Sequence, residues 1–313
     1  MRVAVVDLGT NTTRLLVADV DGETVEEFVK RTQITRLGEG VDERGRLLPL
    51  PIARVRNVLA DYRRELESLG AERTLAIATS AIRDADNGEA FLGEIEQSYG
   101  FVTRLLSGDD EALLTFRGVT AGRSLGAATL IVDIGGGSTE LIVGSRDTVT
   151  SHASLDLGCV RLTERFIRTD PPTEDELDEC ARHVRSSLPD LSVRDVIGVA
   201  GTVTSLAALD LGLLDYDPDR IHGHRLSMEA VERQLLRLAA LPLGERRRVP
   251  GLDPDRAPVI VAGAVILREA LAAFGLPALQ TSEHDILHGA ALAGAELPAA
   301  AAGTVPPGAR SGG

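Results

Sequence analysis

A short segment occurs twice in this chain, 126 positions apart. Residues 3–18 read VAVVDLGTNTTRLLVA, and residues 129–144 read TLIVDIGGGSTELIVG. In both copies an apolar run ends in an aspartate, a glycine-containing turn with hydroxyl side chains follows, and a second apolar run leads away. This pattern predicts a β-hairpin. Because strands and amphipathic helices also alternate in both halves of the chain, we expect an α/β protein with two related, β-first lobes.

The turn of each predicted hairpin has the composition of a phosphate-binding turn. Glycine lets the backbone approach a ligand closely, and successive N–H groups in such a turn form a nest for an anion. Among the differences between the two copies, one reverses the charge: the first has Arg14 where the second has Glu140. We therefore expect a phosphate-bearing ligand to be held between the two lobes.

The composition excludes several classes of protein. A length of 313 residues is enough for two domains of ordinary size. The net charge of −14 argues against a nucleic-acid or anionic-membrane surface, because such surfaces need clustered Lys and Arg. Neither a signal-peptide pattern nor a long apolar run is present, and the two cysteines, Cys159 and Cys180, have no metal-ligand spacing. The sequence predicts a cytoplasmic protein with reduced cysteines.

Apolar periodicity predicts the main helices. Residues 51–69 carry apolar side chains at helical spacing, and residues 256–275 read as one long apolar helix. The segment 35–47 is rich in glycine and charge and reads as a loop. The segment 101–119 reads as a strand, a break and a helix with three acids in its first turn. The low-complexity tail 298–313 is expected to be disordered.

Ten motifs in order make the chain resemble the Ppx/GppA family of exopolyphosphatases and guanosine pentaphosphate phosphohydrolases. They are VVDLGTNTTRLLV, RLGEG, ATSAIRDADN, LSGDDEA, VDIGGGSTELIV, DLGCVRLTERF, VAGTVTSLAAL, HGHRLS, VPGLDPDRAPVIVAGA and SEHDILHGA. The resemblance covers residues 1 to about 297. It implies the duplicated actin-like fold of Hsp70 and sugar kinases, with ribonuclease H-like lobes and a central cleft. The first lobe would be 1–118 with a helix at about 286–297 returning to it, and the second would be 119–285.

The resemblance also implies a catalytic centre. Glu111, in SGDDEA, matches the family's general base for the attacking water, and its neighbour Asp110 stands where the family usually has Glu. Asp133 and Glu140 offer the hard oxygen ligands that Mg²⁺ prefers, and we expect them to hold Mg²⁺ or another divalent cation. The alternative for Glu111 is a plain acid at a helix N-terminus.

Further residues are expected at the substrate. The second turn would hold phosphate oxygens through N–H and hydroxyl groups, and the first would form the opposite clamp, with Arg14 paired to phosphate. Asp7 would either orient the water shell of the metal or cap its own turn, and the VAGTVTSL turn would either contact ligand or serve structure. The set is Gly135, Gly136, Gly137, Ser138 and Thr139; Asp7, Gly9, Thr10, Asn11, Thr12 and Arg14; Arg36 and Arg83; Gly201 and Thr202; with Arg161, Arg225 and Arg256 as weaker candidates.

The predicted activity is Mg²⁺-dependent hydrolysis of terminal phosphate from inorganic polyphosphate. The alternative is 5′-phosphohydrolysis of guanosine pentaphosphate, which uses the same chemistry on another leaving group. Because long family members carry a further helical region, we expect this chain to prefer short polyphosphates. A non-catalytic alarmone sensor is a remote alternative, since the expected catalytic acids are present. A homodimer, common in the family, is compatible with the sequence. Leu287 and His288 stand where the family often has an Arg-Glu pair, which argues against a substrate contact there.

Overall fold

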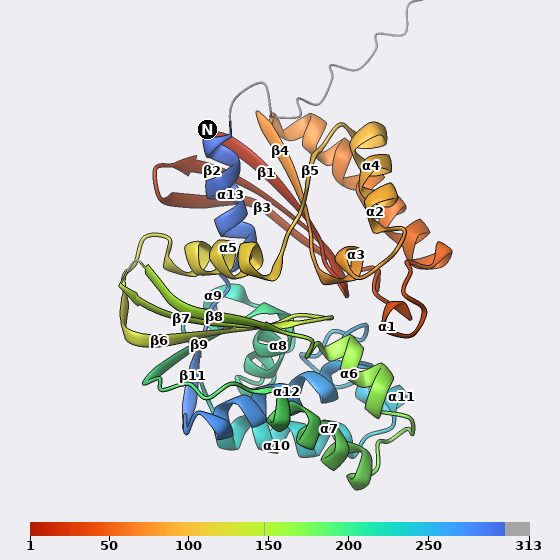
Figure 1. Ribbon diagram of the computed structural model, residues 1–313, viewed down its shortest axis with the longest axis vertical. Coiled ribbons are helices and arrows are strands. Elements are labelled where there is room, and N and C mark those ends of the chain that lie inside the picture. Colours follow the sequence, from red (N-terminus) through yellow and green to blue (C-terminus); the bar gives the residue numbers. More distant parts are fainter. Residues whose placement is uncertain (147, 298–313) are drawn as a thin grey trace, which may run out of the picture. The chain divides into compact units, whose positions relative to one another are not determined.

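The computed structural model describes residues 1–146 and 148–297, in which strands and helices alternate (Figure 1). The chain divides into two compact units. Among the described residues, unit 1 contains Met1–Ser107 and the segment 287–297, and unit 2 is the continuous segment Gly108–Ile286. The tail 298–313, expected to be disordered, lies outside the described residues. Among the described helices, none has an apolar stretch of the length that a lipid bilayer requires.

Unit 1 is built on a five-stranded sheet. Its strands are β1 (Arg2–Leu8), β2 (Thr12–Asp21), β3 (Thr24–Ile34), β4 (Arg73–Ala78) and β5 (Val102–Leu105). Their order is β3-β2-β1-β4-β5. The first three strands are antiparallel, whereas β4 and β5 run parallel to β1. The hairpin predicted from residues 3–18 is thus confirmed as β1 and β2.

Helices cover both faces of this sheet. They are α1 (Val41–Arg44), α2 (Pro49–Leu69), α3 (Ser80–Arg83), α4 (Gly88–Tyr99) and α13 (Ile286–Glu296). The apolar stripe of α2, which includes Val55 and Leu59, packs in one core with Ala4 and Val6 of β1. Val3 alternates with these residues and faces the other way. There a Cβ added at Gly294 of α13 would lie 2.9 Å from Val3 Cγ1, so α13 packs closely on the second face.

Unit 2 is built on a six-stranded sheet in the order β10-β11-β9-β6-β7-β8. The second predicted hairpin is confirmed as its β6 and β7. β9 lies between β6 and β11 and is parallel to both. The other neighbouring pairs in this sheet are antiparallel. Their bounds are β6 (Leu125–Ile134), β7 (Thr139–Arg146), β8 (Thr148–Leu155), β9 (Asp195–Val199), β10 (Arg225–Ser227) and β11 (Ala278–Thr281).

Alternation along β6 divides the core of unit 2 into two layers. Leu130 and Val132 face a large core that α8, α10 and α12 share, and Ile131 faces a smaller core formed with Phe116 of α5. The helices are α5 (Gly108–Thr120), α6 (Cys159–Phe166), α7 (Glu174–Ser187), α8 (Ala200–Asp210), α9 (Pro218–Ile221), α10 (Met228–Ala239), α11 (Leu243–Arg246) and α12 (Ile260–Ala273).

The two copies of the repeated unit exchange their last helices. α5 follows the strands of unit 1 in the chain, yet it packs on β7 and β8 of unit 2. α13 follows the strands of unit 2, yet it packs on β1 of unit 1. Each sheet is therefore completed by a helix that the other half of the sequence supplies.

Two predictions of local structure were wrong in detail. The long helix expected at 256–275 begins only at Ile260, after a series of turns, because Pro258 disfavours helical backbone at the preceding Ala257. The loop expected at 35–47 contains the one-turn helix α1, flanked by Gly40 and Gly45 in the left-handed region. Cys159 and Cys180 are free and buried, as expected for a reduced protein.

Candidate active site

The second hairpin places two carboxylates side by side. Asp133 on β6 is paired in register with Glu140 on β7, and Glu140 is paired with Ser154 on β8. Asp133 is 8% exposed and Glu140 is 3% exposed. Ser154 Oγ donates a hydrogen bond of 2.9 Å to Glu140 Oε1. The three side chains thus form a row across the sheet, on the face that α5 covers.

Two buried carboxylates at opposed positions of a ladder repel each other. A divalent cation removes this cost, and carboxylate oxygens are the ligands that Mg²⁺ or Ca²⁺ takes. Asp133, Glu140 and the neighbouring hydroxyl of Ser154 supply only oxygen, without a thiolate or imidazole. The donor set of the second hairpin therefore fits the expected hard cation.

Hydrogen bonds to its carbonyl groups fix the turn of the second hairpin and leave its N–H groups available to bind an anion. The carbonyl oxygen of Gly135 accepts from Cys159 N (3.0 Å), and that of Gly136 accepts from Val160 N (2.9 Å), both at the start of α6. Arg161 Nε donates to the Gly137 carbonyl at 2.8 Å. Because the carbonyls are bound on one side, the peptide planes are fixed. Within the described residues, the amides of Gly136, Gly137 and Ser138 have no backbone acceptor, as an anion nest requires.

Glu111 lies in the first turn of α5 and is 5% exposed. One helical turn further along, Thr115 Oγ1 donates to Asp133 Oδ2 at 3.3 Å. Residues four apart share a face of a helix, so Glu111 is on the face of α5 that contacts Asp133. Thr115 was not among the predicted site residues. The sequence indication for Thr115 is that it follows Glu111 by four residues and so shares its face of the helix.

The start of α5 is fixed to β8. His152 Nε2 and Asp109 Oδ1 lie 2.9 Å apart, and a Cβ added at Gly108 would lie 2.6 Å from Ser154 Cβ. Ser154, which binds Glu140, is therefore also the residue on which the first turn of α5 rests. Asp110, the neighbour of Glu111, is exposed. The predicted base and the two predicted metal ligands all belong to unit 2, and the contacts of Thr115 and Gly108 connect the helix of the base to the strands of the ligands.

The first hairpin has a different pair at the same ladder position. Asp7 is in register with Arg14, and Asp7 Oδ2 accepts from Arg14 Nε at 2.8 Å and from Arg14 Nη2 at 2.7 Å. The two side chains are 4% and 16% exposed, respectively. The structure thus places the guanidinium expected to hold phosphate on Asp7, where the charges of the two residues offset each other.

The first turn repeats the backbone pattern of the second. The carbonyl oxygen of Asn11 accepts from Thr35 N (3.0 Å) and Arg36 N (2.9 Å), and that of Thr10 accepts from Gly38 N (2.8 Å). Asn11 Oδ1 is buried without a hydrogen-bond partner among the described residues. A buried orphan acceptor is costly unless water or a ligand supplies a donor. This supports a ligand at the first turn.

Hydroxyl side chains help to fix the first turn. Thr10 Oγ1 shares a hydrogen bond of 2.8 Å with Ser80 Oγ of α3. Thr12 and Thr13 begin β2, and Thr13 Oγ1 shares a bond of 2.9 Å with Thr35 Oγ1. In the second hairpin Thr139, the counterpart of Thr13, donates to the Leu157 carbonyl. Gly9 N donates to Thr12 O at 2.9 Å, which closes the turn.

Arg36 and Arg83 both lie in unit 1. Arg36 has a φ of 50°, a left-handed conformation that is unfavourable for a residue with a Cβ. Arg54 stabilises it by donating to the carbonyls of Thr35 (2.6 Å) and Arg36 (3.3 Å). Arg83 ends α3 and donates to the Leu106 carbonyl at 2.9 Å. The strained backbone at Arg36 is the kind of feature that accumulates at functional sites.

Gly201 and Thr202 lie in the first turn of α8 and have different surroundings. A Cβ at Gly201 would lie 1.6 Å from Arg256 Nη1, so the Arg256 guanidinium lies directly on this glycine. Thr202 is buried against Gly263 of α12 and bonds Cys159. Burial raises the pKa of the Cys159 thiol, although the charge of Arg256 and the bond with Thr202 oppose the shift. Thr202 therefore packs α8 against α12, whereas the absence of a side chain at Gly201 leaves room for the guanidinium of Arg256.

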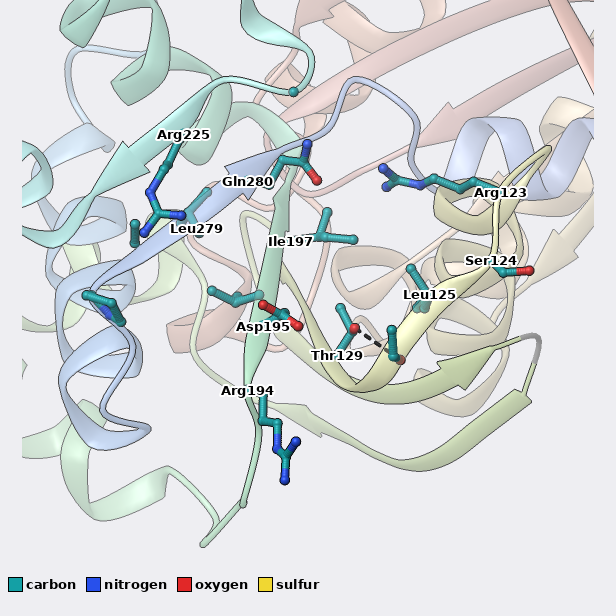
Figure 2. A pocket seen from close by; sticks show the side chains of 15 residues that line it. Arg123, Ser124, Leu125, Thr129, Arg194, Asp195, Ile197, Arg225, Leu279 and Gln280 are labelled. Carbon is teal, nitrogen blue, oxygen red and sulfur yellow. Dashed lines mark hydrogen bonds between the residues drawn. The ribbon is translucent and has the colours of Figure 1, made fainter.

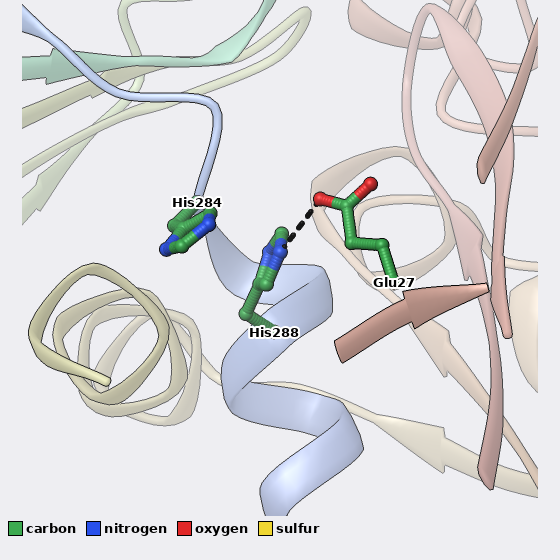
Figure 3. Close-up of side chains that lie close together, drawn as sticks. All are labelled: Glu27, His284 and His288. Carbon is green, nitrogen blue, oxygen red and sulfur yellow. Dashed lines mark hydrogen bonds and ion pairs between the residues drawn. The ribbon is translucent and has the colours of Figure 1, made fainter. Parts of the chain in front are cut away.

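The sequence did not predict the structural contact that the buried His288 makes. His288 on α13 is fully buried, and its Nε2 lies 2.9 Å from Glu27 Oε1 on β3 (Figure 3). Burial acts to raise the pKa of Glu27, but the hydrogen bond with His288 and the charge of Lys30 outweigh it, and the pKa lies below its usual range. The departure from the family at Leu287-His288 was the sequence signal. The pair ties α13 to the sheet of unit 1.

Comparisons with known proteins bear on the family and the fold of the chain. Residues 16–294 match the model of the Ppx/GppA phosphatase family. Exopolyphosphatase 2 of Mycobacterium tuberculosis is 40% identical over 313 aligned residues, which cover 93% of this chain and 98% of that protein. A crystal structure of the Aquifex aeolicus Ppx/GppA family member aligns with a TM-score of 0.79 at 32% identity, covering 94% of this chain and 97% of that chain. An exopolyphosphatase from Cytophaga hutchinsonii aligns with a TM-score of 0.85 at 26% identity, covering 92% and 96%.

Proposed function

Because this chain belongs to the Ppx/GppA phosphatase family, we propose that it is an exopolyphosphatase, which removes terminal orthophosphate from inorganic polyphosphate. Its family makes it a phosphoanhydride hydrolase, and its fold is the duplicated actin-like fold. The name carried by the relatives from Mycobacterium tuberculosis and Cytophaga hutchinsonii supports polyphosphate as the substrate. Hydrolysis of guanosine pentaphosphate receives less support, since neither of these two relatives carries that name.

The observation that carries the mechanism is the link between α5 and the second hairpin. Thr115 bonds Asp133, Ser154 bonds Glu140, and Gly108 rests on Ser154. These contacts fix Glu111 on the face of α5 that meets the carboxylate row. A general base must reach a proton on the attacking water directly or through one further water. Glu111 is the acid of the α5 first turn that is both buried and on this face.

We assign the steps as follows. The amides of Gly136, Gly137 and Ser138 bind oxygens of the terminal phosphoryl group and hold it for in-line attack. Glu111 takes a proton from water as the water oxygen bonds to the terminal phosphorus. The bridging P–O bond breaks, and the shortened chain leaves with the electron pair. Asp133 and Glu140 would hold Mg²⁺, which would neutralise the charge that develops on the phosphate oxygens.

A phosphate-release assay tests this assignment. Glu111→Gln should lower kcat by about 10²–10⁴-fold, the usual contribution of a general base, with a smaller effect on KM. The matched control is Asp110→Asn, which removes a neighbouring but exposed carboxylate and should retain most of the activity. The base is misassigned if Glu111→Gln retains full activity, or if Asp110→Asn has the larger effect.

The same phosphate-release assay measures which substrate the protein prefers. Polyphosphates of defined length, guanosine pentaphosphate and ATP are compared under identical Mg²⁺ concentrations, and then with Mg²⁺ replaced by EDTA. We expect polyphosphate to be the best substrate and EDTA to abolish turnover. Preference for short chains stays a prediction from the sequence, which equal turnover of chains from a few to hundreds of phosphates would contradict. A homodimer and a cytoplasmic location also stay predictions.

A further inference from the structure

α5 covers only part of its face of the unit 2 sheet. It packs on β7 and β8 and on part of β6, whereas the strands on the other side of the sheet are β9, β11 and β10. On these three strands the inward residues Val196, Leu279 and Leu226 are buried in the large core. Their neighbours Asp195, Gln280 and Arg225 are exposed on the opposite face. Alternation therefore places polar side chains on the part of the face that α5 leaves open.

A cavity of about 450 Å³ occupies this place, lined entirely by residues of unit 2. Its charged and hydrogen-bonding side chains include Arg123, Arg194, Arg225, Asp195, Gln280 and Thr129. In Figure 2 the side chains of Arg123 and Gln280 are directed toward each other at one side, and Asp195 lies near the middle. The volume is in the range of pockets that bind small molecules.

The charge of the cavity is opposite in sign to that of the chain. Three guanidinium groups and one carboxylate line it, although the chain as a whole has 33 basic and 47 acidic residues. Arginine forms paired hydrogen bonds with the oxygens of phosphate groups. A local excess of arginine in an acidic protein has the charge that attracts a polyanion.

Arg123 adds an independent indication of a ligand. Its Nε donates to the Val119 carbonyl at 2.7 Å, and its Nη2 is buried without a hydrogen-bond partner among the described residues. An unsatisfied buried donor costs free energy that a bound oxyanion would recover. Burial also lowers the pKa of Arg123, an effect that an adjacent anion opposes.

The cavity is separate from the catalytic row. Thr129 lines the cavity and Asp133 belongs to the catalytic row, and both are on β6. Four strand residues span about 13 Å. Ile131 lies between them on the same face, in the core shared with α5. An anion in the cavity therefore does not occupy the second turn.

We propose that this cavity is an accessory binding site for a small anion that carries two or three linked phosphates. Arg123 and Arg225 bind its oxygens, Arg194 adds charge at the rim, and Gln280 and Thr129 supply further hydrogen bonds. Asp195 opposes the ligand and limits its affinity. Inorganic tripolyphosphate and the triphosphate group of a nucleotide share this chemistry.

Calorimetric titration of the full chain with tripolyphosphate, at low ionic strength and in EDTA, tests the site. Arg225→Gln should weaken binding about tenfold, the effect of one charge-assisted hydrogen bond. Asp195→Asn should strengthen it about threefold, because it removes the opposing charge. The matched control is Arg220→Gln, which removes an exposed arginine outside the cavity and should leave the affinity unchanged.

The pattern of the three variants decides the outcome. Equal affinity in wild type, Arg225→Gln and Asp195→Asn overturns the proposal, as does a loss in Arg220→Gln as large as in Arg225→Gln. Arg123→Gln provides a second cavity variant that should also weaken binding, with circular dichroism as the check on folding. Repeating the titration with ATP distinguishes the sources. A variant-dependent affinity for tripolyphosphate alone indicates an inorganic ligand, and the same dependence for ATP indicates a nucleotide.

Discussion

The two hairpins share their backbone and differ in their charges. In both, a segment after the third strand donates amides to the carbonyls of the turn, from Thr35 and Arg36 in unit 1 and from Cys159 and Val160 in unit 2. At the same ladder position, however, unit 1 has an Asp-Arg pair and unit 2 has an Asp-Glu pair. The first pair is neutral by itself, whereas the second brings together two like charges when both groups are ionised. One frame therefore supports an internal ion pair in unit 1 and, in the function proposed above, a pair of metal ligands in unit 2.

The largest effect is expected from making the second hairpin like the first. Glu140→Arg would give Asp133 an internal partner in place of a metal, and activity should fall by roughly 10³-fold. Phosphate release in Mg²⁺ measures this, and circular dichroism checks folding. The reciprocal Arg14→Glu added to Glu140→Arg should not restore activity, because the first turn of α13, which packs on that face of β1, contains no acidic residue. Activity near that of wild type in Glu140→Arg would show that the two ladder pairs are interchangeable.

The next effect concerns the neutral pair of the first hairpin. Arg14→Gln leaves the buried Asp7 carboxylate without its cation, and the free energy of unfolding should fall by about 3 kcal/mol. Urea unfolding followed by circular dichroism measures the change. Asp7→Asn in the same chain should recover most of the loss, because no buried charge then remains. If the double variant is as unstable as Arg14→Gln, the pair does not act through charge.

Two glycines that flank the turns provide a smaller contrast. A Cβ at Gly158 would lie 2.1 Å from the Gly136 carbonyl oxygen, which is backbone, whereas at Gly38 it would lie 2.3 Å from a methyl of Thr10, which is side chain. A side chain can shift more easily than a bound turn. Gly158→Ala should therefore cost about 2 kcal/mol of stability, more than Gly38→Ala, and should also reduce turnover. Equal costs in urea unfolding would contradict this difference.

The smallest effect concerns the side-chain hydrogen bonds that hold α13 and α5 on their sheets. His288 and Glu27 tie α13 to β3, and Asp109 and His152 tie α5 to β8. The lowered pKa of Glu27 means that its stabilisation is present above the ordinary carboxyl pKa and is lost as the pH falls through the lowered value. At pH 7, Glu27→Gln should cost about 1 kcal/mol. The exposed Asp109→Asn should cost about 0.5 kcal/mol or less.

Unfolding of both variants across pH 3–7 measures this difference. The cost of Glu27→Gln should disappear at the acid end, because the wild-type carboxylate is then protonated as well. A cost that stays constant across this range would assign the contribution of Glu27 to packing.

Much of this arrangement was predictable from short-range pattern. The two hairpins and the helix at 51–69 follow from periodicities of two and 3.6 residues, and both are confirmed. The partner of Arg14 was not predictable, because an arginine can reach either a ligand or a neighbouring strand. Its choice depends on register and burial. The contact between Thr115 and Asp133 depends on which sheet α5 covers, a long-range property that local sequence does not contain.

The exchange of last helices has a consequence for synthesis on the ribosome. Unit 2 is continuous in the chain, so its strands and α5 have all been synthesised once Ile286 has been added. The strands of unit 1 are made first, but Val3 cannot pack on α13, and Glu27 cannot bond His288, until α13 has been made. Domains normally fold as their sequences emerge. In this chain the sheet of unit 1 is translated before that of unit 2 but is completed after it. The face of the unit 1 sheet that α13 covers therefore stays exposed in the nascent chain until α13 has been made.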